Sequence, residues 1–153
     1  MIEIKRVETL GELQQNMPLF LEGFRQMNKR HKAFDCDEQG FIKTLIGVLG
    51  TGPDNAIALA TVEGKGVGYG VGFDDTPTYC EKRHFLLWAL YVKPEWSKLV
   101  TKPLFERAEE YAKEQGYVVM RAYNGRMNGS SFKFFESCFK MRRHRVEFTK
   151  EIL

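Results

Sequence analysis

The sequence predicts an α/β domain, and three observations support this prediction. The run 85–92 is apolar at every position, and an amphipathic helical pattern follows it. Two β-type runs, 56–62 and 67–73, flank the glycine-containing stretch 63–66, which is typical of a hairpin. The remaining segments change between helical and strand periodicity, without an internal repeat. A strand that is apolar on both sides is typical of a sheet covered on both faces.

Length and composition indicate one domain over residues 1–153. The chain has 153 residues, of which 43% are hydrophobic and 28% charged, enough for a sizeable core. No apolar run approaches the roughly 20 residues that cross a bilayer. The start, Met1–Arg6, has no apolar signal segment, so we expect a cytoplasmic protein without membrane contact. The net charge of +3 is too small to indicate nucleic-acid binding by itself.

The three cysteines do not form a recognisable pattern. Cys36, Cys80 and Cys138 lie far apart and share no metal-ligand spacing with histidines. We therefore expect neither a disulfide nor a metal site, and buried or idle thiols instead.

The N-terminal third predicts one strand and a series of helices. Residues 2–7 alternate as a strand, and 9–27 have a helical pattern that Pro18 interrupts. We expect a helix, a kink at Pro18, a short second helix and a basic linker over 28–32. A further helix is predicted over about 37–49, ended by the stretch 50–54. The apolar face expected for this last helix comprises Phe41, Ile42, Leu45, Ile46 and Leu49.

The second strand of the hairpin is rich in glycine. Gly66, Gly68, Gly70 and Gly72 alternate with other residues, so they are predicted to share one bare face. That face could admit a ligand or a neighbouring backbone, or the glycines could mark a bulge or an edge strand. Both readings are open at this stage.

The helix after the apolar strand is predicted over 101–116. Thr101 can act as its N-cap, Pro103 fits its first turn, and Gly116 can end it, while Glu109 and Lys113 form an i,i+4 pair. Its apolar face comprises Leu104, Phe105, Ala108, Tyr111 and Ala112. The joint between strand and helix would present unpaired N–H groups, which favour an anion. The alternative is an ordinary crossover helix without a ligand.

The C-terminal part predicts a strand over 117–123, a helix over 129–139 capped by Asn128, and a last strand over 142–152.

Two motifs and the element order resemble the GNAT superfamily of acyl-coenzyme A N-acyltransferases. Residues 90–96, LYVKPEW, look like the family's strand ending in V-x-P-E-Y, and residues 128–136 are similar to its N-x-x-A-x-x-x-Y-E pattern. The resemblance covers nearly the whole chain. It implies a mixed, mostly antiparallel central sheet flanked by about four helices. It also implies acyl transfer from acetyl-coenzyme A to an amine, with no metal.

The resemblance also implies where the acyl donor would bind. Main-chain groups near the end of the apolar strand would hold the thioester and pantetheine, and the start of the next helix would hold the pyrophosphate. The implied donor-binding residues are Leu90, Tyr91, Val92, Ser97, Lys98, Leu99, Val100, Thr101, Lys102, Asn128, Ser131 and Phe135. The family's phosphate segment reads R/Q-x-x-G-x-G/A, whereas residues 97–102 here contain neither glycine. We therefore expect weaker or reshaped coenzyme binding, because a Cβ hinders close approach of backbone N–H groups to phosphate.

Groups that move protons are missing where the family places them. The matching positions hold Leu86, Trp88 and Phe135, none of which can transfer a proton. Tyr91 and Tyr123 are the candidate catalytic residues, with the alternative that both are core aromatics whose hydroxyls reach water. His84 is interpreted as a surface or loop residue.

Three functional hypotheses follow. The first is an N-acetyltransferase whose acceptor is an amine on a small molecule or a protein. The second is a non-catalytic module of the same fold that keeps a coenzyme or partner site. The third is polyanion binding through the basic run 140–145, although a solvated strand end explains that run equally simply, and nucleic acid is not the expected partner. A short C-terminus could leave the sheet edge open or completed by a second subunit, giving a homodimer.

Overall fold

The computed structural model describes residues 1–30, 37–52, 55–122, 134–142, 150 and 152. Within them a five-stranded sheet has its strands in chain order, β1-β2-β3-β4-β5. The strands are β1 (Ile2–Arg6), β2 (Ala56–Val62), β3 (Lys65–Asp74), β4 (His84–Val92) and β5 (Val119–Ala122). The first four pair antiparallel, and β5 pairs parallel to β4. The predicted α/β fold with a mixed, mostly antiparallel sheet is confirmed.

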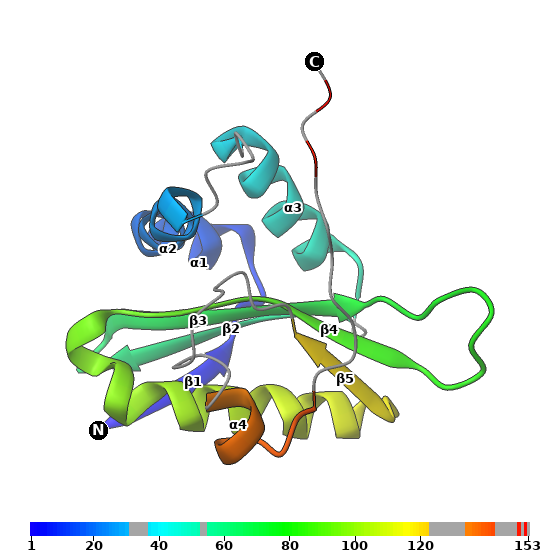
Figure 1. The fold of residues 1–153 in the computed structure, drawn as a ribbon. Helices are drawn as coiled ribbons and strands as arrows, with labels where there is room; N and C mark the ends of the chain where they lie inside the picture. Colours follow the sequence, from blue (N-terminus) through cyan, green and yellow to red (C-terminus); the bar gives the residue numbers. More distant parts are fainter. Residues whose placement is uncertain (31–36, 53–54, 123–133, 143–149, 151, 153) are drawn as a thin grey trace.

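Helices cover both faces of the sheet (Figure 1). The helices α1 (Leu10–Gln15), α2 (Met17–Arg30) and α3 (Glu38–Gly50) lie on one face. There Phe20, Phe24, Phe41 and Leu45 are buried against the sheet. The helix α4 (Ser97–Glu114) lies on the other face, where Val100 and Leu104 are fully buried. In the described part of the chain, none of the helices is long and apolar enough to cross a membrane.

The break between the first two helices falls at Asn16, not at Pro18. Asn16 ends α1, and Pro18 is the second residue of α2. Proline is tolerated in a first turn because the N–H that it lacks has no helical partner there. The expected break between two helices is therefore confirmed, but its predicted position at Pro18 was wrong by two residues. The basic linker expected from residue 28 was also wrong, because α2 continues to Arg30.

The predicted start of α3 is confirmed, and its expected apolar face is partly wrong. The side chain of Asp37 accepts a hydrogen bond from Gln39 N at 2.9 Å and caps the helix. Phe41, Leu45 and Val48 form the buried stripe, whereas Ile46 is 45% exposed. The sheet covers only one i, i+4, i+7 stripe of this largely apolar helix.

The predicted hairpin is present, with a two-residue turn at Glu63 and Gly64. Their φ values are +50° and +76°, as a type I′ turn requires. A bulge lies in β3, because Ala60 pairs with Gly68 while Thr61 pairs with Gly66. Gly66 therefore faces Leu19 and Asn16 on the α1–α2 side. The prediction that all four strand glycines share one face was wrong.

The other strand glycines lie against side chains of β4 and not against open space. A Cβ at Gly72 would stand 2.1 Å from the ring of Phe85, and one at Gly68 would stand 3.0 Å from Val92 Cγ2. These glycines make room for their neighbours in an interior strand, which agrees with the close-approach and bulge readings and excludes the edge-strand reading.

A second bulge, in β4, controls which side chains reach each face. Val71 pairs with Ala89 and Gly72 with Leu87, so Trp88 is the extra residue. Before the bulge, the odd-numbered Phe85 packs with residues of α4. After the bulge, Tyr91 packs instead with the α1–α3 cluster. An extra residue reverses the alternation of faces, and this reversal turns Tyr91 toward α2.

The C-terminal predictions fall mostly outside the described residues. This is so for Tyr123, Asn128 and Ser131, for residues 129–133 of the helix predicted over 129–139, and for most of the strand predicted over 142–152. Residues 134–138 form one π-helical turn, η2. The rings of Phe135 and Phe139 lie 6.4 and 3.7 Å from that of Phe105 in α4. This segment therefore packs on α4 through aromatic contacts.

Candidate functional site

The strands β4 and β5 pair over only part of β4. The parallel ladder joins His84–Leu87 to Val119–Ala122. From Trp88 to Val92, no described strand pairs with that edge of β4, and β5 runs off at an angle (Figure 1). Leu90, Tyr91 and Val92 are only half-buried. Among the described residues, the peptide groups on this edge have no strand partner, and an extended ligand can pair with such an edge by strand addition.

The helix after β4 starts four residues earlier than predicted. A 3₁₀ turn, η1 (Pro94–Trp96), leads directly into α4 at Ser97. The predicted N-cap role of Thr101 and first-turn position of Pro103 were wrong, since both residues lie inside the helix. Pro94 at the start of the 3₁₀ turn takes the place expected for Pro103. The stretch that resembles a phosphate loop is therefore helical.

The implied phosphate-binding residues have different surroundings. Lys98 and Leu99 are exposed on the first turn of α4, whereas the side chain of Val100 is fully buried. Ser97 Oγ and Ser97 N both donate to the carbonyl of Pro94, the former at 3.1 Å. Lys102 Nζ lies 3.8 Å from Glu106 Oε1, a loose surface pair. The N–H of Ser97 is already bonded to the carbonyl of Pro94, whereas Lys98 and Lys102 are exposed. These two lysines are therefore the side chains of this stretch most able to bind a phosphate.

A polar cluster on the opposite face joins α2 to the end of β4. Tyr91 Oη donates to Glu22 Oε2 at 2.7 Å, and Lys93 Nζ donates to Glu22 Oε1 at 3.0 Å. The Glu22 carboxylate thus holds one phenol and one ammonium group. The hydrogen bond from Tyr91 and the charge of Lys93 keep the pKa of Glu22 below its ordinary value, against the opposing effect of burial. Glu22 is ionised at neutral pH.

The absence of a side chain on Gly23 lets α2 approach the two tyrosines. A Cβ there would stand 2.3 Å from Tyr69 Oη and 2.7 Å from Tyr91 Cγ. Tyr69 is buried and donates to the carbonyl of Phe20 at 3.2 Å. Burial also raises the pKa of the Tyr69 phenol, so Tyr69 stays protonated. The close packing at Gly23 brings Glu22 within reach of Tyr91.

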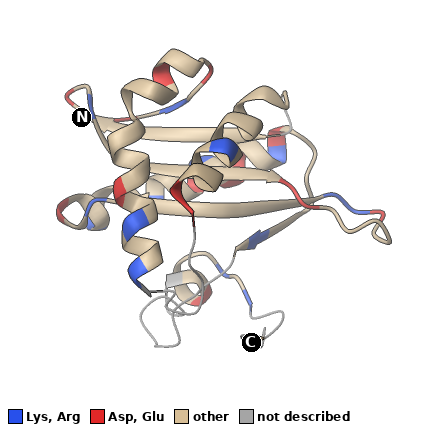
Figure 2. Cartoon of the chain, turned by 90° about the horizontal axis from the view of Figure 1, so that it is seen from above, with Lys and Arg blue, Asp and Glu red and all other residues tan. Residues whose placement is uncertain are grey.

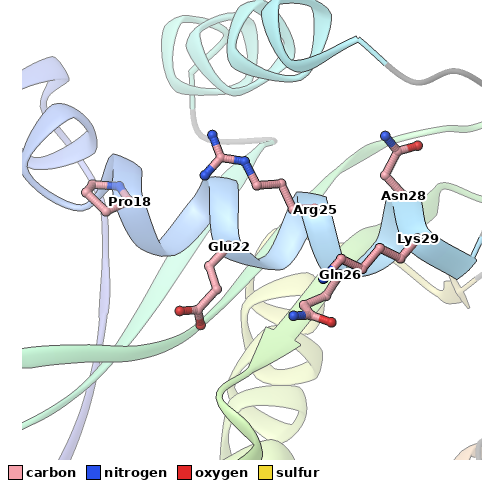
Figure 3. A pocket seen from close by; sticks show the side chains of 6 residues that line it. All are labelled: Pro18, Glu22, Arg25, Gln26, Asn28 and Lys29. Atoms are coloured by element: carbon pink, nitrogen blue, oxygen red, sulfur yellow. The ribbon is translucent and has the colours of Figure 1, made fainter.

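An open hollow of about 560 Å³ lies along α2 next to this cluster (Figure 3). It is lined by Pro18, Glu22, Arg25, Gln26, Asn28 and Lys29. Figure 3 shows Glu22, Gln26 and Lys29 on one side of the helix and Arg25 and Asn28 on the other. The described residues that line this hollow all belong to α2, so it is an open surface along one helix.

Leu86 and Trp88, which the resemblance matches to proton-transfer positions, are in apolar surroundings. Leu86 is buried, and Trp88 stacks on Phe41 with ring centroids 5.6 Å apart. The interpretation of His84 as a loop residue was wrong, because it is the first residue of β4. Within the described residues, its Nδ1 is buried without a hydrogen-bond partner. Of the two predicted catalytic candidates, Tyr91 and Tyr123, Tyr91 is the one among the described residues. Its hydroxyl donates a hydrogen bond to Glu22 and does not lie in the apolar core.

Sequence reasoning missed Glu22. Tyr91 and Glu22 are 69 positions apart, and Glu22 is one of many polar residues on amphipathic helices. The bulge at Trp88, which turns Tyr91 toward α2, and the close approach at Gly23 bring the two together.

Replacing Tyr91 by Phe should raise the pKa of Glu22 toward its ordinary value of 4.5, because the hydrogen bond from Tyr91 is the largest cause of its lowering. Lys93→Met should raise it less. A lowered folded-state pKa contributes stability above the unfolded value, and this contribution is lost as pH falls through the folded value. The stability of Tyr91→Phe should therefore depend less on pH in that acidic window. NMR titration of the Glu22 carboxyl checks both variants, and an unchanged pKa in Tyr91→Phe would refute the assigned cause.

Comparison with known proteins gives structural likeness without sequence likeness. The chain matches no family sequence model and no curated protein sequence. It is similar to an aminoglycoside acetyltransferase from an uncultured soil metagenomic sample, with a TM-score of 0.71, 17% identity and coverage of 99% of this chain and 97% of that one. It is also similar to a glucosamine-6-phosphate N-acetyltransferase from Arabidopsis thaliana, with a TM-score of 0.71, 15% identity and coverage of 99% of this chain and 98% of that one. A third similar structure is an aminoglycoside N-acetyltransferase in complex with CoA, with a TM-score of 0.71, 17% identity and coverage of 99% of this chain and 95% of that one. At these identities the likeness establishes the fold.

Proposed function

We propose that this chain, which has the fold of the GNAT superfamily, transfers an acetyl group from acetyl-coenzyme A to a primary amine by direct attack. The observation that supports this most is the edge of β4 beyond Leu87, which no strand of the described residues pairs with and which lies beside the start of α4. A thioester donor needs an extended backbone edge for its amide-containing arm and cations for its phosphates. This joint offers both.

The donor would lie along Leu90–Val92, with its phosphates near Lys98 and Lys102. Peptide N–H and C=O groups of the β4 edge can bond the amides of an extended arm. Lys98 and Lys102 are both exposed on the first two turns of α4, where the N-terminal end of the helix also favours negative charge. Val100, between the two lysines, is fully buried, so its side chain is not available to the donor. We therefore expect the lysine side chains, and not backbone groups alone, to hold the phosphates.

The amine would approach from the α2 side, toward Glu22 and Tyr91. Its nitrogen attacks the thioester carbonyl carbon, a C–N bond forms, the C–S bond breaks, and the amine proton leaves as the thiolate gains one. Glu22 can accept hydrogen bonds from an amine, but its lowered pKa makes it a weak base. With Leu86 and Trp88 apolar, the proton passes to water. The reaction therefore depends on the amine being already neutral.

The pH dependence tests this proposal. For a lysine-like acceptor, kcat/KM should climb with pH toward the free amine pKa of about 10.4, because only the neutral amine attacks. Thiol release from acetyl-coenzyme A, measured across a panel of amines at several pH values, gives this profile. A plateau near pH 7 would instead show a side-chain base, with Glu22, Tyr91 and His84 the first to substitute.

A non-catalytic binding module is the second candidate. The helical, glycine-free stretch 97–102 and the apolar Leu86 and Trp88 favour it. This candidate predicts measurable coenzyme binding by calorimetry without thiol release for any amine in the panel. Thiol release with even one amine would exclude it.

A further inference from the structure

Three side chains form a row along the side of α2 next to β4. Glu22, Gln26 and Lys29, which we call the α2 row, share one side of the helix, and the Lys29 side chain runs back along the helix toward Gln26 (Figure 3). At a rise of 1.5 Å per residue, Glu22 and Lys29 are separated by about 10 Å along the axis. The row therefore places a carboxylate, an amide and an ammonium group along one hollow.

The two ends of the row have opposite charge. The Glu22 carboxylate uses one hydrogen bond from Tyr91 and one from Lys93, which leaves acceptor capacity on both oxygens. Lys29 forms no ion pair with any other residue in the described part of the chain, and its side chain is exposed. Arg25 points to the other side of the helix, where its Nε binds Glu38 at 2.7 Å. Figure 2 shows positive charge along the C-terminal half of α2.

We propose that the acceptor is an amine that also bears an anionic group, a carboxylate or a phosphate. Glu22 receives the amino end beside Tyr91, and Lys29, assisted by the amide of Gln26, holds the anion. This inference rests on the proposed acyl transfer and adds the substrate class. A polycationic acceptor is disfavoured, because the charge of Lys29 would repel it, whereas Lys93 is paired with Glu22.

Matched acceptors test the charge requirement on the full chain with acetyl-coenzyme A. One arm compares ω-amino carboxylates of two to six carbons with their neutral amides, and the other compares glucosamine 6-phosphate with glucosamine. The parent should prefer the anionic member of at least one pair by about tenfold in kcat/KM, as expected for one charge-assisted contact. The arm with the larger preference distinguishes carboxylate from phosphate.

The variant Lys29→Glu should lower kcat/KM for the preferred anionic acceptor about tenfold or more and leave its neutral partner within about twofold. Lys43→Glu, the same charge change on an exposed residue of α3, should alter neither. Equal use of both members of every pair, or an equal loss for both in Lys29→Glu, would overturn the inference while thiol release still supports acyl transfer.

If no amine releases thiol, the proposed reaction fails, and calorimetry with the same pairs decides the inference separately. Binding of the anionic member that is lost in Lys29→Glu and kept in Lys43→Glu would support an anionic amine as the ligand of the α2 row. Absence of that difference would overturn it.

Discussion

Replacing Gly23 by Ala should lower the free energy of unfolding by about 2 kcal/mol, although alanine usually stabilises a helix. The added Cβ would stand 2.3 Å from Tyr69 Oη and 2.7 Å from Tyr91 Cγ. Tyr69 is buried, and the contact with Tyr91 is at Cγ, the ring atom next to its Cβ, so neither side chain can easily move aside. The helix α2 must therefore shift away from the sheet. The same shift should weaken the hydrogen bond between Glu22 and Tyr91. Urea denaturation measures the first effect, and NMR titration of Glu22 the second.

Gly47→Ala is the matched control. Gly47 lies in the exposed part of α3, and a Cβ there would meet nothing within 4 Å. Only helix propensity then acts, and the free energy of unfolding should rise by about 0.5–1 kcal/mol. The two substitutions should thus have opposite signs. Equal effects would show that α2 is not packed on the tyrosines through Gly23.

The double variant Lys98→Glu with Lys102→Glu should weaken binding of coenzyme A by about a hundredfold or more. Each charge-assisted contact with phosphate contributes about 1.5–3 kcal/mol, and two such contacts would be lost at once. Calorimetric titration with coenzyme A and with acetyl-coenzyme A at low ionic strength measures the change, since salt screens exposed charges.

Its control is Lys82→Glu with Lys113→Glu, which changes the net charge equally. Lys113 lies at the far end of α4, where its Nζ is 3.0 Å from Glu109, and Lys82 lies in the loop before β4. Coenzyme binding should be nearly unchanged in this control. If the first double variant binds as tightly as the parent, the donor site does not lie at the joint between β4 and α4.

Features governed by short-range rules could be predicted from the sequence. The hairpin around the stretch 63–66, the start of the helix at about residue 37 and the pair of Glu109 with Lys113 all depend on residues a few positions apart. The order of strands and helices, and hence the fold class, follows from such local patterns.

Features governed by register could not be predicted. An all-apolar strand has no alternation that fixes its faces, so nothing in 85–92 reveals the bulge at Trp88. The orientation of Tyr91 and its bond with Glu22 depend on that bulge. The predicted start of α4 was also wrong. Thr101 and Pro103 satisfy the usual signals for a helix start, but the helical stretch begins at Pro94 instead.

The strictly sequential strand order also determines how the sheet can assemble from an unfolded chain. The strands β2, β3 and β4 form a meander in which each strand pairs with the next. Such pairs need short loop closures and form early, whereas β1 must find β2 across three helices, and β5 adds through four parallel pairs after α4. The bond between Tyr91 and Glu22 spans 69 positions and closes after the meander. We therefore expect this corner of the site to be among the last parts of the described fold to form during folding.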